Sequence, residues 1–174
     1  MQRCRRAVNK EKGIKMEFIK KQSIGVWISL VSLILAIAGL IAYQNNISSD
    51  GYFKGASVSA AIPWTAAAIV MIVAAIAAAQ IPLGGMADKL MDLAASALRI
   101  LAPALLIGAA MSVLSGRVEG IGYILFSNEE VLQEVQTQAN LASVNSAVTC
   151  IVLLAVAGAI AMIAAFFGLK KKAH

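Results

Sequence analysis

Few residues of this 174-residue chain have side chains suited to catalysis or metal binding, and they are scattered. The only histidine is His174, and the two cysteines, Cys4 and Cys150, lie far apart in the sequence. There is no His-Glu-x-x-His zinc motif, no Walker phosphate loop and no Gly-x-Ser-x-Gly nucleophile motif. A hydrolase or a metal enzyme needs several titratable groups around one pocket. We therefore expect no enzyme activity, with no catalytic residue, no metal ligand and no cofactor site.

Arg99 is a charged residue at the edge of an apolar block, four residues before Pro103. A proline leaves a nearby carbonyl without its helical hydrogen bond, so the sequence predicts a kink here. In one interpretation, Arg99 is a lipid or anion contact beside these loosened carbonyls. In the other, its long side chain extends to the inner membrane surface. The sequence favours the second interpretation, and Arg99 stays the candidate for a lipid or anion contact.

A second candidate site is a group of acidic residues before the last apolar block: Glu129, Glu130 and Glu134. Ser127 followed three residues later by Glu130 resembles a capping box, which predicts a polar helix that continues to about Ala139. We expect this helix to lie on or above the outer membrane surface. Its three glutamates then form the segment most suited to contact a partner protein.

The elements that position these residues are four long apolar blocks, at residues 24–43, 62–81, 94–115 and 147–169. The chain is 60% hydrophobic and 14% charged, whereas soluble domains average about 45–50% apolar and about 25% charged residues. A helix of about 20 residues spans the hydrocarbon layer of about 30 Å. Because helices satisfy their own backbone hydrogen bonds in lipid, the sequence predicts an all-α polytopic membrane protein. The expected architecture is a four-transmembrane-helix up-down bundle with a short extracytoplasmic helix before the last span.

Basic residues flank the apolar blocks unevenly, and this asymmetry predicts the orientation. Thirteen of the fifteen Lys and Arg fall on one side, in tails over residues 1–23 and 170–174 and around residues 89–99. Only Lys54 and Arg117 fall on the other side. Since basic residues favour the cytoplasmic face, both termini are expected in the cytoplasm. The lack of glycan and disulfide signals favours a bacterial inner membrane. The net charge of +6 is thus explained without nucleic acid as a partner.

The start of the chain leaves an alternative open. From Met16, a charged start, an apolar stretch and the sequence Ala36-Ile37-Ala38 imitate a cleavable signal peptide. The apolar stretch continues to Tyr43, which favours an uncleaved first span. Cleavage would leave three spans and an external N-terminus. The sequence also leaves open whether Met16 is the native start.

Inside the apolar blocks, the residue pattern favours helix packing over ligand binding. Small residues four apart align on one helix face, and such pairs are Ala74 with Ala78, Ala75 with Ala79, Ala104 with Gly108, and Ala157 with Ala161. Hydroxyls are expected to bond to carbonyls of their own or a neighbouring helix, and they belong to Ser29, Ser32, Thr65, Ser112 and Thr149. The central membrane region has no Asp, Glu or His, which proton pumps and coupled transporters usually carry there.

Several short motifs mark the edges of the blocks. They are the Lys-Lys pair before the first span, Trp27 within it, the Gly39-Leu40-Ile41-Ala42-Tyr43 exit, the Gly51-Tyr52-Phe53-Lys54-Gly55 loop and the lysine tail. Over residues 16–172, this pattern resembles small uncharacterised four-helix integral membrane proteins of bacteria. The resemblance implies a four-helix membrane fold and carries no function, because the motifs contain no active-site residue.

Three functions remain, in order of preference. The first is a non-enzymatic accessory or scaffold component of a membrane complex, whose acidic outer segment contacts a membrane-protein partner. The second is an oligomeric channel or facilitator for a small solute, which requires a homo-oligomer in the lipid bilayer. The third is a lipid-modifying membrane enzyme that uses Arg99 and loop acids, although no base, nucleophile or metal site accompanies them.

Overall fold

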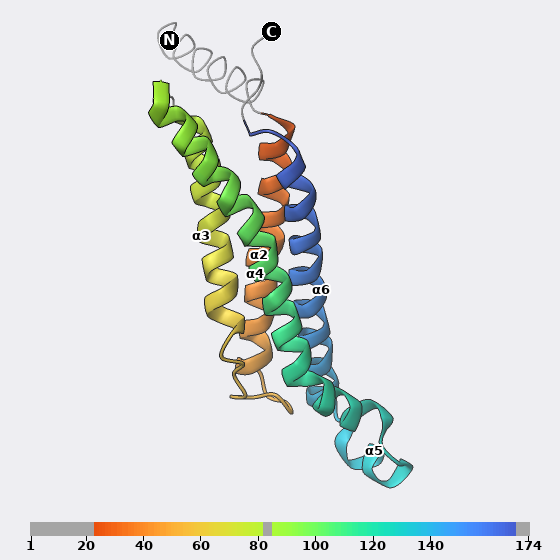
Figure 1. The fold of residues 1–174 in the computed structure, drawn as a ribbon. Helices are drawn as coiled ribbons and strands as arrows, with labels where there is room; N and C mark the ends of the chain where they lie inside the picture. Colours follow the sequence, from red (N-terminus) through yellow and green to blue (C-terminus); the bar gives the residue numbers. More distant parts are fainter. Residues whose placement is uncertain (1–22, 82–84, 170–174) are drawn as a thin grey trace, which may run out of the picture.

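The structure is a computed structural model that describes residues 23–81 and 85–169 (Figure 1). Within these ranges it has no strand and five helices: α2 (Ile24–Ser48), α3 (Ala61–Gln80), α4 (Gly85–Phe126), α5 (Glu129–Val135) and α6 (Gln138–Phe166). All of these except α5 are long and apolar enough to cross a membrane. The prediction of an all-helical protein with four candidate membrane spans is therefore confirmed.

Part of the sequence predictions concerns residues that the structure does not describe. The basic tails, residues 1–23 and 170–174, lie outside the described residues apart from Ser23. The same holds for Met16 and Cys4, so the native start of the chain stays a prediction.

α4 is the longest helix and differs most from the expectation. Its 42 residues include Pro103 without a break, and they also include Lys89 and Asp92, which precede the block predicted at residues 94–115. Its buried face continues past residue 115 at helical spacing, through Val113, Arg117, Gly120 and Ile124. At 1.5 Å per residue, α4 is about 63 Å long, roughly twice the thickness of the hydrocarbon layer.

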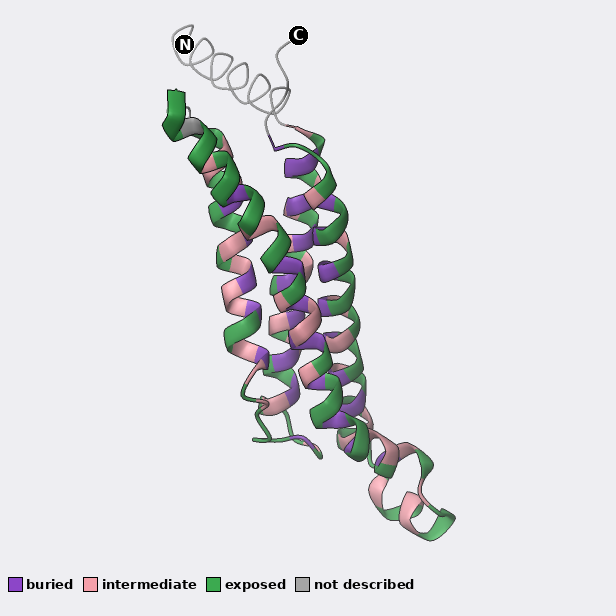
Figure 2. Cartoon of the chain, viewed as in Figure 1, coloured by how far each residue is buried: buried purple, intermediate pink, exposed green. Residues whose placement is uncertain are grey.

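Successive long helices run in opposite directions and pack side by side (Figure 1). α6 packs against both α2 and α4, and α4 packs against α3, whereas α2 and α3 share a smaller contact. We call the end at which α2 begins and α6 ends the tail end, and the opposite end the loop end. Figure 2 shows buried residues on the sides that face neighbouring helices and exposed residues on the outside, where many of them are large and apolar.

Small residues let these helices approach one another closely. A Cβ atom on Gly39 of α2 would lie 2.8 Å from Leu154 Cδ2, and one on Gly158 of α6 would lie 2.8 Å from Ile107 Cγ1. Ala157, from one of the predicted small pairs, is fully buried. Close van der Waals contact of this kind is what holds apolar helices together in lipid, where burial from water contributes little.

Three of the five hydroxyls predicted to bond to backbone carbonyls do so in the structure. Ser29 and Thr65 each donate to the carbonyl four residues earlier in their own helix, at 2.8 Å and 2.7 Å. Ser32 of α2 donates across the interface to the Ala157 carbonyl of α6 at 2.8 Å. These bonds satisfy polar groups that would otherwise be unpaired in an apolar interior.

The residues between α2 and α3, 49–60, pack back onto the loop end, and we call them the α2–α3 segment. Phe53 of this segment is only 3% exposed. The Val58 N–H donates to the Tyr43 hydroxyl of α2 at 2.6 Å. The segment is therefore a fixed part of the fold and closes the loop end.

A short helix does precede α6, but it begins and ends at other residues than predicted. Its cap is Asn128 and not Ser127, because Asn128 Oδ1 accepts a hydrogen bond from the first turn of α5 at 3.1 Å. The helix ends at Val135 instead of about Ala139. It ends early because the Thr137 hydroxyl caps the next helix, α6, which therefore begins before its apolar block.

Candidate functional site

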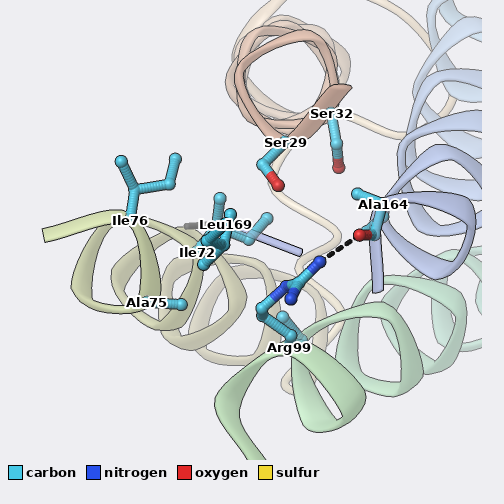
Figure 3. A pocket seen from close by; sticks show the side chains of 10 residues that line it. Ser29, Ser32, Ile72, Ala75, Ile76, Arg99, Ala164 and Leu169 are labelled. Atoms are coloured by element: carbon cyan, nitrogen blue, oxygen red, sulfur yellow. Dashed lines mark hydrogen bonds between the residues drawn. The ribbon is translucent and has the colours of Figure 1, made fainter. Parts of the chain in front are cut away.

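Arg99 lies on α4 near the tail end, and its side chain points into the protein toward α6 (Figure 3). Its Nη2 atom donates to the carbonyls of Ala164 and Phe167, at the end of α6. Carbonyls at this end of a helix carry the negative end of its dipole, so a cation is stabilised there. The sequence favoured a side chain that extends to the membrane surface, whereas the structure holds Arg99 against α6.

Arg99 also lines two cavities. The first, which we call the chamber, has about 20 Å³ and lies among the helices, with Ser29 and Ser32 of α2 on its far side (Figure 3). The second, which we call the tail-end pocket, has about 320 Å³ and is lined by Arg99, Asp92 and Ser96. The chamber is the size of a single water molecule. Arg99 thus lines both a small, mainly apolar chamber and a larger open pocket.

The three predicted partner-contact residues lie at the opposite end, exposed on α5: Glu129, Glu130 and Glu134. α5 forms a projection together with the end of α4 and the start of α6, and we call residues 121–142 the head (Figure 1). The base of the head is firmly packed, because Ile124 is fully buried against Phe53 and Val144. The head therefore has a defined position relative to the long helices.

The structure keeps the two predicted sites apart. From Arg99 to Phe126, α4 rises by about 40 Å, and the glutamates lie beyond Phe126 on α5. Arg99 and the head acids therefore cannot act on one small substrate. This separation removes the geometric basis for an enzyme that combines them.

Among the buried polar residues that the sequence analysis missed are Arg117 on α4 and Asn46 on α2. Arg117 is 2% exposed and lies inside α4, although it follows the end of the block predicted at residues 94–115. Its Nη2 donates to the Ala56 carbonyl, and its Cζ lies 4.5 Å from the centre of the Phe53 ring. Its Nε has no hydrogen-bond partner among the described residues. Arg117 thus holds the α2–α3 segment against α4.

Helical spacing was the signal that could have found both residues. Arg117 lies four residues after the buried Val113, and Asn46 lies three residues after the buried Tyr43. Residues three or four apart share a helix face. Extending each helix past its apolar block would therefore have placed both polar side chains on the buried face.

Asn46 gives a direct test of this buried polar contact. Its Nδ2 donates to the Ser143 carbonyl at 2.7 Å and to Ser146 Oγ at 3.0 Å, which joins α2 to α6. We expect Asn46→Ala to lower the free energy of unfolding by about 2 kcal/mol, because one buried and one partly buried hydrogen bond are lost. Denaturant unfolding in detergent measures the change. The neighbouring Asn45 is exposed, so Asn45→Ala should change stability by less than about 0.5 kcal/mol, and equal effects would contradict the prediction.

The chemistry available at these sites is binding by charge and hydrogen bonds. Within the described part of the chain, no group of three or more His, Cys, Asp or Glu side chains is placed to hold a metal ion. Cys150 is a buried free thiol inside α6. Compared with protein-family models, with curated proteins and with solved structures, the chain has no match.

Proposed function

We propose that the protein is a non-enzymatic multi-pass membrane component, an accessory or scaffold subunit that binds a partner protein through its head. The observation that carries this proposal is the projection of the head past the ends of α2 and α3 (Figure 1). A surface that extends beyond the membrane-spanning helices is accessible to another protein.

The two arginines of α4 support a placement across a bilayer. From Arg99 to Arg117, α4 rises by about 27 Å, close to the thickness of the hydrocarbon layer. Both guanidinium groups bond to backbone carbonyls, that of Arg99 to Ala164 near the end of α6 and that of Arg117 to Ala56 in the α2–α3 segment. Charges at these two levels, with apolar helix faces between them, fit the two edges of a membrane.

The distribution of basic residues supports the orientation. With Arg117 buried, Lys54 is the exposed cation that remains at the loop end in the described part of the chain. The basic tails adjoin the start of α2 and the end of α6 in the sequence, and Lys89 lies near the start of α4. These cations therefore belong to the tail end. Under the positive-inside rule, the tail end is cytoplasmic and the head is extracytoplasmic, in a cell membrane of the bacterial inner-membrane type.

The head is ordered although much of it is exposed, which suits a binding surface. α5 has no buried residue, and hydrogen bonds fix it in place, from Gln136 Nε2 to the Ile124 carbonyl at 3.1 Å and from Asn140 Nδ2 to the Val135 carbonyl at 2.8 Å. Phe126 is 81% exposed beside the acidic residues. A preorganised surface loses little entropy on binding, and an aromatic anchor with acidic neighbours suits a basic partner surface.

Site-specific photo-crosslinking in native membranes tests the proposal. A photoreactive residue at Gln133, which is exposed on α5, should give one discrete crosslinked species with a partner protein. The same residue at Ser59, exposed in the α2–α3 segment, should give none. If Gln133 gives no adduct while the purified protein moves a small solute into liposomes, the oligomeric channel replaces this proposal.

Charge variants test the role of the acidic surface. Replacing Glu129, Glu130 and Glu134 together by Gln should reduce the Gln133 adduct about tenfold, because three charge contacts of roughly 0.5 kcal/mol each are lost. The matched control is Glu119→Gln, which neutralises an exposed acid of α4 outside the head. An equal loss in the control would show that overall charge, and not the head, drives the contact.

A further inference from the structure

We infer that the tail-end pocket binds the headgroup of a zwitterionic aminophospholipid, with the phosphate on Arg99 and the ammonium group on Asp92. The pocket is lined by both residues. It lies at the opposite end of α4 from the head, so this inference is independent of the partner-binding role. It requires only that the long helices lie in a bilayer.

The depth of Arg99 fits a lipid headgroup. Arg99 donates to the Phe167 carbonyl at the end of α6. The start of α2 is at the same level, since a Cβ atom on Gly25 would lie 2.7 Å from that same carbonyl oxygen. One apolar helix, α2, therefore begins at the level of Arg99, and another, α6, ends there. In a bilayer, this is the level at which hydrocarbon meets the headgroups.

Arg99 has hydrogen-bond donors available for a phosphate. A guanidinium carries five N–H donors, and the two contacts to α6 use only Nη2. Its Nε is buried and out of reach of a ligand in the pocket, so the donors left for a phosphate belong to the outer guanidinium nitrogens. A phosphate oxygen is the acceptor that guanidinium groups bind most strongly.

The charges of the pocket select a zwitterion. Asp92, Ser96 and Arg99 lie four and three residues apart, on one face of α4. Long helical side chains lean toward the N-terminus of their helix, which brings the Arg99 guanidinium toward the level of Asp92. A lipid with phosphate alone would meet the negative charge of Asp92, whereas an ammonium group can donate to that carboxylate.

An apolar groove beside the pocket can hold an acyl chain. It has about 620 Å³ and runs between α4 and α6, lined by Ile100 and Pro103 on one side and Met162 and Phe166 on the other. Ile100 is 67% exposed, so the groove faces the surroundings of the long helices. Because Ile100 directly follows Arg99 in the chain, headgroup pocket and groove lie within one helical turn.

Native mass spectrometry of the purified full chain tests the inference by titration with three lipids of equal acyl chains. Phosphatidylethanolamine should bind about tenfold more tightly than phosphatidylglycerol, which lacks the ammonium group. It should also bind more tightly than phosphatidylcholine, whose methylated nitrogen has no N–H to donate. Equal affinities, or tighter binding of phosphatidylglycerol, would overturn the inference.

Single substitutions test the two proposed contacts, the ammonium group with Asp92 and the phosphate with Arg99. Asp92 is exposed, so Asp92→Asn should fold normally and reduce the preference for phosphatidylethanolamine over phosphatidylglycerol to roughly twofold or less. Arg99→Gln should weaken the binding of all three lipids. Lys89 is an exposed residue of α4 that does not line the pocket, so Lys89→Gln should leave all three affinities unchanged. A preference that survives Asp92→Asn overturns the inference even if Arg99→Gln fails to fold.

Discussion

We expect Gly51→Ala to lower the free energy of unfolding by about 3 kcal/mol. Gly51 has a φ of +153°, a conformation that residues with a Cβ rarely adopt. An added Cβ would also lie 2.7 Å from the Ala139 carbonyl oxygen and 2.7 Å from Ser143 Cβ, both on α6. Backbone strain and overlap therefore add, and the α2–α3 segment has to move away from α6. Denaturant unfolding of the purified protein in detergent measures the loss.

Two other glycines separate these causes. Gly55 has a φ of +72° but no atom within 4 Å of an added Cβ, so Gly55→Ala should show strain alone, about 1 kcal/mol. Gly122 lies within α4, and a Cβ there would also have no atom within 4 Å. Gly122→Ala should therefore stabilise by up to about 1 kcal/mol through helix propensity. If Gly51→Ala lowers the free energy of unfolding by no more than Gly55→Ala does, Gly51 does not pack closely against α6.

The apolar blocks predicted the four long helices because their length and composition leave no alternative in lipid. The helix ends were harder to predict, and α4 shows why. Gly116 and Gly120 favour a loop by intrinsic propensity, yet α4 uses both for close packing. A Cβ on Gly116 would lie 2.8 Å from Val58 Cγ2, and one on Gly120 would lie 2.6 Å from Phe53 Cε1. Contacts with a distant segment thus override local propensity, and propensity alone does not reveal them.

The candidate sites show the same division between local and distant information. The exposed acids of a short helix before α6 could be predicted, since charge is a property of neighbouring residues, although the cap was assigned to Ser127 and not to Asn128. The environment of Arg99 could not, because its acceptors, Ala164 and Phe167, are 65 and 68 residues away in the sequence. Which carbonyls lie near a long side chain depends on how the helices pack. The tail-end pocket therefore became visible only in the structure.

Arg117→Ala should lower the free energy of unfolding by about 3 kcal/mol, the balance of three effects. Truncating a side chain that is 2% exposed leaves a cavity. The contacts with the Ala56 carbonyl and the Phe53 ring are lost as well. Relief from burying a charge offsets part of this loss. Unfolding in detergent measures the net change, and the α2–α3 segment should become accessible to proteolysis.

Arg117→Met and Arg117→Lys separate the volume of the side chain from its charge. Methionine fills a similar space, and replacing a buried ion by an apolar group of equal volume is often neutral, so Arg117→Met should stay within about 1 kcal/mol of the native protein. Lysine keeps the charge but loses the planar group over Phe53, so Arg117→Lys should cost about 2 kcal/mol. Lysine is strongly hydrated and tolerates this position only if water reaches it. The prediction fails if Arg117→Lys keeps the native stability while Arg117→Met loses much of the free energy of unfolding. That result would mean that water reaches this position and that Arg117 is not buried against the α2–α3 segment.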